Sequence, residues 1–101
     1  MSNGKTKRLT GRELDQIARH FRLLGEPMRL RILQAVRRRP RMVNDIVAAV
    51  GATQANVSKH LALLANAGIL TREKDGQRVY YGMKNQLTVK MCELVHSQLA
   101  Q

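Results

Sequence analysis

The stretch that decides the fold is Thr53-Gln-Ala-Asn-Val-Ser-Lys-His-Leu-Ala-Leu-Leu64. Its apolar residues recur at the i, i+4, i+7 and i+8 spacing of one helix face, namely Val57, Leu61, Leu64 and Ala65. The opposite face carries short side chains and one cation, namely Ala55, Ser58, Lys59 and Ala62. Thr53 is a suitable N-cap, and Gly68 follows as a helix stop. The spacing therefore predicts an amphipathic helix with a thin outer edge.

A thin edge that can form hydrogen bonds suits a helix that enters a narrow space, and the major groove of DNA, about 12 Å wide, is such a space. The alternative is an ordinary surface helix, although its outer face would more often carry Glu and Lys in i,i+4 pairs. The charge of the chain favours the groove. Eighteen Lys and Arg against seven Asp and Glu give a net charge of +11, and such an excess favours a polyanionic partner.

The composition also limits the other classes of protein. A chain of 101 residues suffices for one domain. Aromatic residues make up only 3% of it, which disfavours an RNA-binding platform of stacked aromatics. No apolar run approaches the roughly 18 residues that span a bilayer, and the first eight residues lack the apolar stretch that is typical of a secretory signal. We therefore expect no membrane partner and a cytoplasmic location, which the single Cys92 does not oppose.

The segment before the deciding stretch predicts a basic arm and three further helices. Residues 1–11, with Lys5, Lys7 and Arg8, are expected to form a flexible arm, and residues 12–101 one folded domain. A first helix is expected over residues 12–24, with Leu23 off its apolar stripe and therefore available for an intermolecular contact.

The next helix begins at Pro27 and stops before Pro40. Arg37–Arg39 at its end either complement the helix dipole or contact phosphate, two compatible roles. A third helix over residues 43–50 ends at Gly51, just before Thr53. Two helices joined by a short turn that contains glycine have the spacing of a helix-turn-helix.

After Gly68 the apolar period changes from the helical 3.6 toward the 2 of a strand. Residues 69–74 and 78–83 flank Asp75-Gly76, a hairpin turn signal, and basic side chains lie near the tip. A last helix is expected over residues 85–99. The predicted class is mainly α with a small β-hairpin (α+β), in the order of four helices, two strands and a helix. That order is a winged helix-turn-helix.

Three segments then permit a comparison with a known family. Leu24–Leu33 matches the pattern Leu-x-x-Pro-x-Arg-Leu-x-Ile-Leu, and Thr53–Leu61 is similar to Ser-Gln-x-x-Val-Ser-x-His-Leu. Residues 67–70 and 76–81 are similar to a strand–wing–strand segment. Over about residues 12–100 the chain resembles the ArsR/SmtB family of bacterial repressors. The resemblance implies a homodimer that binds an inverted-repeat operator in double-stranded DNA.

The resemblance also implies roles for individual residues. DNA contacts are expected from the outer edge of the deciding helix and from the hairpin: Gln54, Ala55, Asn56, Ser58, Lys59, Lys74, Gln77 and Arg78. Dimer contacts are expected from the first and last helices: Leu14, Ile17, Phe21, Leu87, Met91, Leu94 and Val95. His60, at the flank of the buried stripe, is assigned to packing rather than to base contact.

The two metal sites that are standard in this family are not matched. The thiolate-site segment reads Val43-Asn-Asp-Ile46, without sulfur. The zinc-site positions hold side chains that are poor zinc ligands or none: Asn85, Leu87, Gln98 and Gln101. We therefore expect no metal and no cofactor. Cys92 is interpreted as a small core residue, with a redox or metal sensor formed with His96 as the alternative.

An enzyme is not expected, because the chain has no glycine-rich phosphate loop, no histidine–carboxylate cluster and no nucleophile motif. The alternative from another class is a basic protein-interaction module that binds a partner through its first and last helices and contacts DNA non-specifically. Enrichment of a symmetric DNA site distinguishes the repressor from this module.

Overall fold

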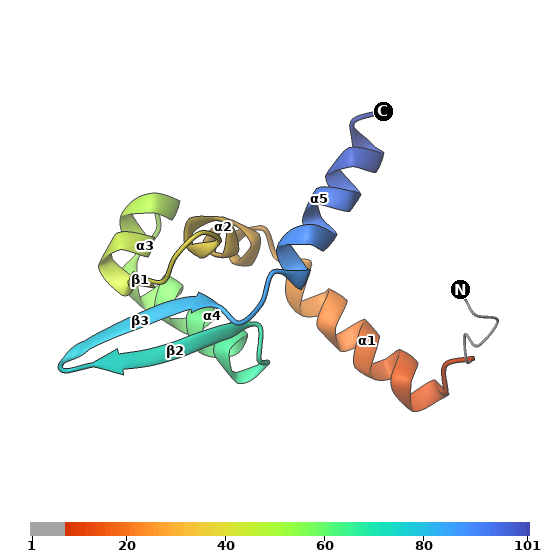
Figure 1. Ribbon diagram of the computed structural model, residues 1–101, viewed down its shortest axis with the longest axis horizontal. Helices are drawn as coiled ribbons and strands as arrows, with labels where there is room; N and C mark the ends of the chain where they lie inside the picture. The colour runs from red at the N-terminus through yellow and green to blue at the C-terminus, as the bar shows by residue number, and fades with distance from the viewer. Residues whose placement is uncertain (1–7) are drawn as a thin grey trace.

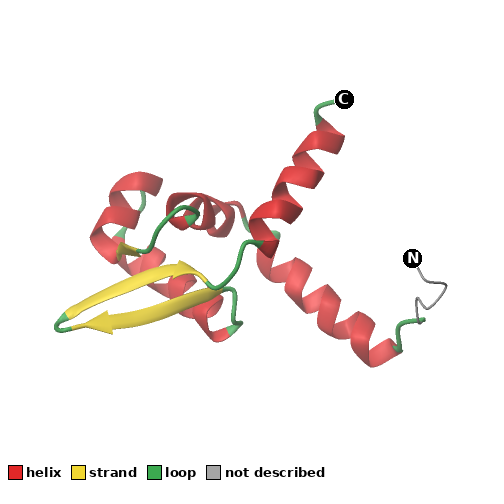
Figure 2. Cartoon of the chain, viewed as in Figure 1, coloured by secondary structure: helices red, strands yellow, loops and turns green. Residues whose placement is uncertain are grey.

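The computed structural model describes residues 8–101, and Figures 1 and 2 show its arrangement. The elements are α1 (Gly11–Leu24), α2 (Pro27–Val36), β1 (Arg41–Met42), α3 (Val43–Val50), α4 (Gln54–Asn66), β2 (Leu70–Asp75), β3 (Arg78–Met83) and α5 (Leu87–Leu99). Helices α2, α3 and α4 form one body with the sheet, and α1 and α5 project from it. The predicted class, a winged helix-turn-helix, is confirmed, with β1 as an additional strand. Lys5 and Lys7 of the predicted arm lie outside the described residues.

Local hydrogen bonds determine where the helices begin. The Glu13 backbone N–H donates to Thr10 Oγ1 (3.1 Å) and the Thr10 N–H donates to Glu13 Oε1 (2.8 Å), which is a capping box. Gly11, assigned from sequence to the arm, is therefore the first residue of α1. Helix α5 begins at Leu87, later than predicted, where Asn85 Oδ1 accepts from the Leu87 N–H (3.0 Å).

The core is aliphatic and lies between α2, α3, α4 and the start of β2. It consists of Ile32, Leu33, Val36, Ile46, Val57, Leu61, Leu64, Ile69 and Leu70. Helix α1 contributes no fully buried residue, but Leu23 and Leu24 at its end pack against this core. The expectation that Leu23 is available for an intermolecular contact was therefore wrong. The chain turns after Leu24, and the turn places the last residues of α1 against the body.

The sheet is antiparallel with the order β1-β3-β2. Asp75 pairs with Arg78, so the hairpin loop is Gly76–Gln77 rather than the predicted Asp75-Gly76. Gly76 has a φ of 64°, which the first residue of a tight hairpin turn requires. Strand β1 was not predicted, because two residues are too few to show an alternating pattern. Pro40, just before it, packs on Gly82, where an added Cβ would lie 2.9 Å from Pro40 Cγ.

Helices α1 and α5 leave their apolar side chains uncovered. Phe21 of α1 is 54% exposed, and Leu94 of α5 is 71% exposed. The radius of gyration is 15.7 Å, against about 13 Å for a compact domain of this length. No helix among the described residues is long and apolar enough to cross a membrane.

Candidate nucleic-acid interface

Helix α4 has one face fixed in the core and one face free. Val57, Leu61 and Leu64 are fully buried, and the Asn56 N–H donates to Thr53 Oγ1 (3.2 Å), which confirms the predicted cap. Gly51, with a φ of 69°, ends α3 and lets the chain turn into α4. The outer edge is formed by residues that are all exposed: Gln54, Ala55, Asn56, Ser58 and Lys59. The sequence-predicted DNA contacts of this helix thus lie together on its free face.

A hydrogen-bonded pair connects α4 to α2. His60 is 9% exposed, and its Nδ1 accepts from Arg29 Nε (3.1 Å). Arg29 Nη1 also donates to the Leu23 carbonyl at the end of α1 (3.1 Å). The packing role predicted for His60 is confirmed. Its partner Arg29 was not predicted, because its sequence position does not show which helix its side chain reaches.

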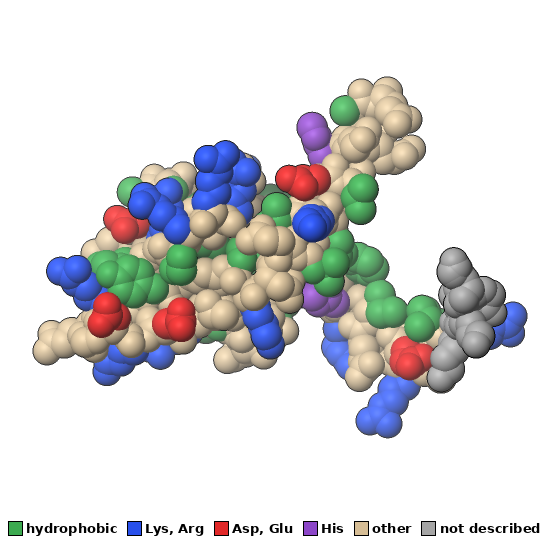
Figure 3. Space-filling view, viewed as in Figure 1, with side chains coloured by type: hydrophobic (Ala, Val, Ile, Leu, Met, Phe, Trp, Pro, Cys, Tyr) green, Lys and Arg blue, Asp and Glu red, His purple; other side chains and the backbone are tan. Residues whose placement is uncertain are grey.

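The two faces of the hairpin carry different charges. Side chains alternate along a strand, so Arg72 and Lys74 lie on the same face of β2 as Leu70, which is buried in the core. The other face carries Glu73 and Asp75. Figure 3 shows acidic side chains on the side of the sheet that it presents to the viewer, with α4 behind.

The register separates the hairpin residues predicted to contact DNA. Arg78 pairs directly with Asp75 and shares its face, whereas Lys74 pairs with Val79 on the opposite face. Gln77 lies in the turn. Arg72 was not among the predicted contacts, although its place two residues before Lys74 in a strand could have indicated it. Its Nε donates to the Tyr81 hydroxyl (3.2 Å), which steadies the basic face.

The residues predicted to form a dimer lie on α1 and α5. All are exposed except Met91, which is half-buried: Leu14, Ile17, Phe21, Leu87, Leu94 and Val95. An apolar groove of about 340 Å³ lies where α1, α2 and α5 meet, and is lined by Phe21, Leu24, Leu30, Met91, Val95 and Leu99, among others. Figure 3 shows apolar side chains gathered where α5 meets α1. The protomer therefore leaves a continuous apolar surface uncovered.

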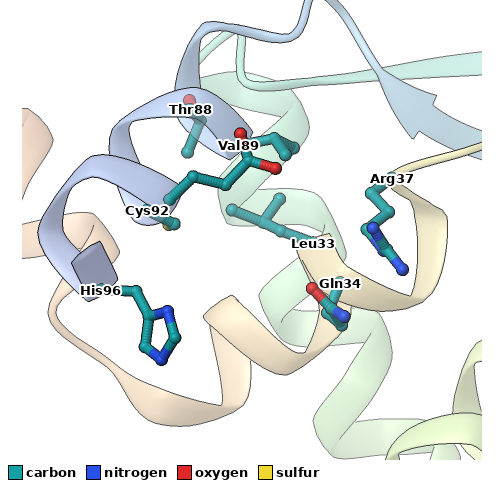
Figure 4. Close-up of a pocket in the computed structure, with 8 residues that line it drawn as sticks. Leu33, Gln34, Arg37, Thr88, Val89, Cys92 and His96 are labelled. Atoms are coloured by element: carbon teal, nitrogen blue, oxygen red, sulfur yellow. The ribbon is translucent and has the colours of Figure 1, made fainter. Parts of the chain in front are cut away.

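Cys92 is exposed, so its interpretation as a core residue is wrong for the single chain. Figure 4 shows Cys92 and His96 of α5 across from Gln34 of α2 and from Arg37, which follows α2. These residues line a cavity of about 320 Å³. Residues 8–101 contain no group of three or more His, Cys, Asp or Glu side chains placed to hold a metal ion.

Known proteins resemble this chain in sequence and in fold. The model of the arsR family of bacterial regulatory proteins matches residues 26–72. The transcriptional repressor SmtB of Mycobacterium tuberculosis is 37% identical over 68 residues, which are 67% of this chain and 50% of SmtB. The cadmium resistance transcriptional regulatory protein CadC of Listeria innocua is 30% identical over 93 residues, which are 91% of this chain and 78% of CadC.

A solved structure extends the similarity to the fold. The homodimeric winged helix-turn-helix DNA-binding domain of a Mycobacterium bovis protein matches with a TM-score of 0.77 at 26% identity, over 94% of this chain and 91% of that one. The chain spans about half the length of several curated relatives that it matches, including SmtB. The family consists of transcriptional regulators and not of enzymes, in agreement with the expectation from sequence. Because the family model matches the helix-turn-helix and the similarity to CadC covers most of both proteins, this chain belongs to the ArsR family of bacterial regulatory proteins.

Proposed function

We propose that this protein is a transcriptional repressor that binds an inverted-repeat operator in double-stranded DNA as a homodimer. The observation that carries the proposal is the division of α4 into two faces. Its apolar face is fully buried at Val57 and Leu61, while its outer edge presents short polar side chains to solvent. Only the outer edge is free to enter a groove, and the fixed apolar face determines which side chains that edge presents.

The chemistry of the outer edge fits base recognition. A glutamine side chain can pair bidentately with adenine, and a serine hydroxyl can contact several base edges. Gln54 and Ser58 are therefore assigned to bases, and Lys59 to phosphate. Ala55 and Asn56 complete the edge, and a short side chain such as Ala55 allows the helix backbone to approach the bases closely.

The hairpin adds positive charge to that of Lys59, the only lysine or arginine of α4. Lys74, together with Arg72 on the same face, is assigned to the DNA backbone, because phosphate contacts provide most of the sequence-independent affinity. Gln77 lies in the hairpin turn, next to Arg78, and is exposed. Arg78 is assigned a smaller share, because Asp75 lies directly opposite and offsets its charge.

The uncovered surface of α1 and α5 supports the homodimer. Apolar side chains as exposed as Leu94 (71%) and Leu99 (77%) are normally covered by a partner when they form a continuous patch. The M. bovis domain of the same fold is described as homodimeric. Two-fold symmetry would place the two α4 helices about 34 Å apart, one turn of DNA.

The proposal includes no use of the two standard metal sites. Leu87, at one of the zinc-site positions, has no ligand atom in its side chain, and neutral amides are poor zinc ligands. Cys92 and His96 provide two ligands for each chain, so a zinc site of three or four ligands would need the pair from both subunits of the dimer. We also propose a cytoplasmic location, because a bacterial repressor binds its operator in the cytoplasm.

Selection from a pool of genomic DNA fragments, followed by a salt series on the enriched fragment, tests the function. Strong enrichment of a two-fold symmetric site is the result that we expect. Uniform weak binding to all fragments would instead support a protein-interaction module whose positive charge is incidental. The salt series separates the electrostatic part of the affinity from the part that reads bases.

A further inference from the structure

We propose that a pocket of arginines at the end of α2 binds a phosphate-class oxyanion, such as a small phosphorylated molecule. The pocket, called the arginine pocket below, has a volume of about 310 Å³. Its lining contains no carboxylate and consists of Gln34, Ala35, Arg37, Arg38, Arg39 and Arg41. None of these residues belongs to the proposed DNA interface or to the dimer surface.

Compensation of the helix dipole at the end of α2 does not account for the number of arginines there. The C-terminus of a helix carries a partial charge of about −0.5, so one nearby cation is enough to compensate it. Four arginines line this pocket. They repel one another until an anion lies between them, and a phosphate with two negative charges is well matched to such a cluster.

Arg41 provides an independent indication of a ligand. Its Nε is shielded from solvent and has no hydrogen-bond partner among the described residues. The backbone of Arg41 is fixed by the pairing of β1 with Tyr81 of β3. A buried donor without an acceptor is costly. Because Nε is closed off from solvent, a bound oxyanion would satisfy it only after the side chain turns toward the pocket that Arg41 lines. The planar guanidinium also suits two parallel hydrogen bonds to a phosphate.

The arginine pocket lies beside the start of α5. Gln86 Nε2 donates to the Arg37 carbonyl (3.3 Å), and Gln86 follows the end of β3 that is far from the hairpin turn. Gln34 and Arg37 also line the cavity between α2 and α5 (Figure 4). An anion here would lie beside Arg37 and the start of α5 on one side. On the other side is Arg41, which pairs with Tyr81, the residue that also pairs with Arg72. The source of the phosphate, a free molecule or bound DNA, is therefore one of the outcomes of the test.

Isothermal titration of the full chain with inorganic pyrophosphate, in a chloride buffer, tests the site. We expect saturable binding at one site per chain. Arg38→Gln should weaken it about tenfold or more, in line with the loss of one charged hydrogen bond. Arg41→Lys keeps the charge but loses the planar fork, and should weaken it as well. Arg31→Gln, an exposed arginine of α2 outside the pocket, is the matched control and should change it less than twofold.

Absence of saturable binding, or an equal loss in Arg31→Gln and Arg38→Gln, would overturn the site, because the second result would reflect net charge alone. Binding of the same variants to random duplex DNA over a salt series distinguishes the source of the phosphate. If the dependence of DNA affinity on salt concentration (the salt slope) is unchanged in Arg38→Gln, the pocket binds a free phosphorylated molecule. A lower salt slope would assign the arginines to the DNA backbone and overturn the small-molecule site. The titration contains no DNA, so its outcome is independent of the proposed repressor function.

Discussion

Helices α4 and α5 have the same length, 13 residues, and each carries an apolar stripe. The chain covers one stripe and leaves the other open. In α4 the buried residues include Leu61 and Leu64, both 0% exposed, whereas in α5 only Thr88 is buried and Leu94 is 71% exposed. Because the apolar face of α4 is buried within its own chain, only its polar edge is available for recognition. The apolar face of α5 is exposed, so it is available to a partner.

Truncation of the two stripes should give effects of different kinds. Leu61→Ala removes a side chain from the centre of the core and should lower the free energy of unfolding by about 2–5 kcal/mol. The loss should not depend on protein concentration, because α4 is covered within its own chain. Leu94→Ala is the matched control, and any loss there should shrink as the protein is diluted toward the monomer. Urea unfolding at two protein concentrations measures both, and a concentration-dependent loss in Leu61→Ala would contradict the comparison.

A charge on the open stripe should separate the protomers. Leu94→Glu places a carboxylate where an apolar partner is expected, and should weaken dimerisation by at least about 2 kcal/mol, or roughly thirtyfold. Sedimentation measures the association, and circular dichroism checks that the helix content is unchanged. A variant that remains fully dimeric would show that α5 does not form the interface.

The free edge of α4 should affect sequence preference more than stability. Ser58→Ala and Gln54→Ala should each weaken operator binding by about 1–3 kcal/mol for a lost base contact, and random DNA by much less. Asn66→Ala, exposed at the far end of α4, is the control. Titrations with operator DNA and with random DNA measure these affinities. Equal losses of affinity for the two DNAs would rule out base reading.

The two faces of the hairpin should differ in the salt dependence of DNA binding, which is a smaller effect. Lys74→Ala should lower the salt slope of DNA binding by about 0.9 for one lost phosphate contact. Arg78→Ala should lower it less, because Asp75 opposes Arg78 in the register. Fluorescence anisotropy over a range of salt concentrations measures the slopes. The assignment of the faces is wrong if the two variants give the same slope.

The smallest effect is expected at Cys92. Because this thiol is exposed, Cys92→Ser should change the free energy of unfolding by less than about 0.5 kcal/mol. Unchanged DNA release by peroxide and thiophilic metals in this variant would also exclude a sensing role. A loss of stability above 1 kcal/mol would show that the thiol is packed away in the assembled protein.

The spacing of apolar residues, together with the residues that begin and end helices, was sufficient to predict most of the fold. The apolar spacing in α4, the cap at Thr53 and the stop at Gly51 are local signals, and the structure contains all of them. Strand β1 has no such signal, because its two residues depend on pairing with β3 and on contact between Pro40 and Gly82.

The errors at single residues have a related cause. Leu23 and Cys92 each lie beside an apolar stripe, and the sequence does not say which side of a helix the rest of the chain covers. Leu23 packs on the core and Cys92 is exposed. The pairing of Arg78 with Asp75 was not visible in the sequence, because it depends on the register that the Gly76–Gln77 turn sets.

Hydroxyl-radical footprinting on the enriched operator tests the central claim most directly, since it reports where the two α4 edges lie on DNA. The expected pattern is a pair of protected tracts related by two-fold symmetry, with centres about 10 base pairs apart. A single protected tract, or the same pattern after Ser58→Ala and Gln54→Ala are combined, would contradict the claim that the outer edge of α4 reads DNA in a symmetric dimer.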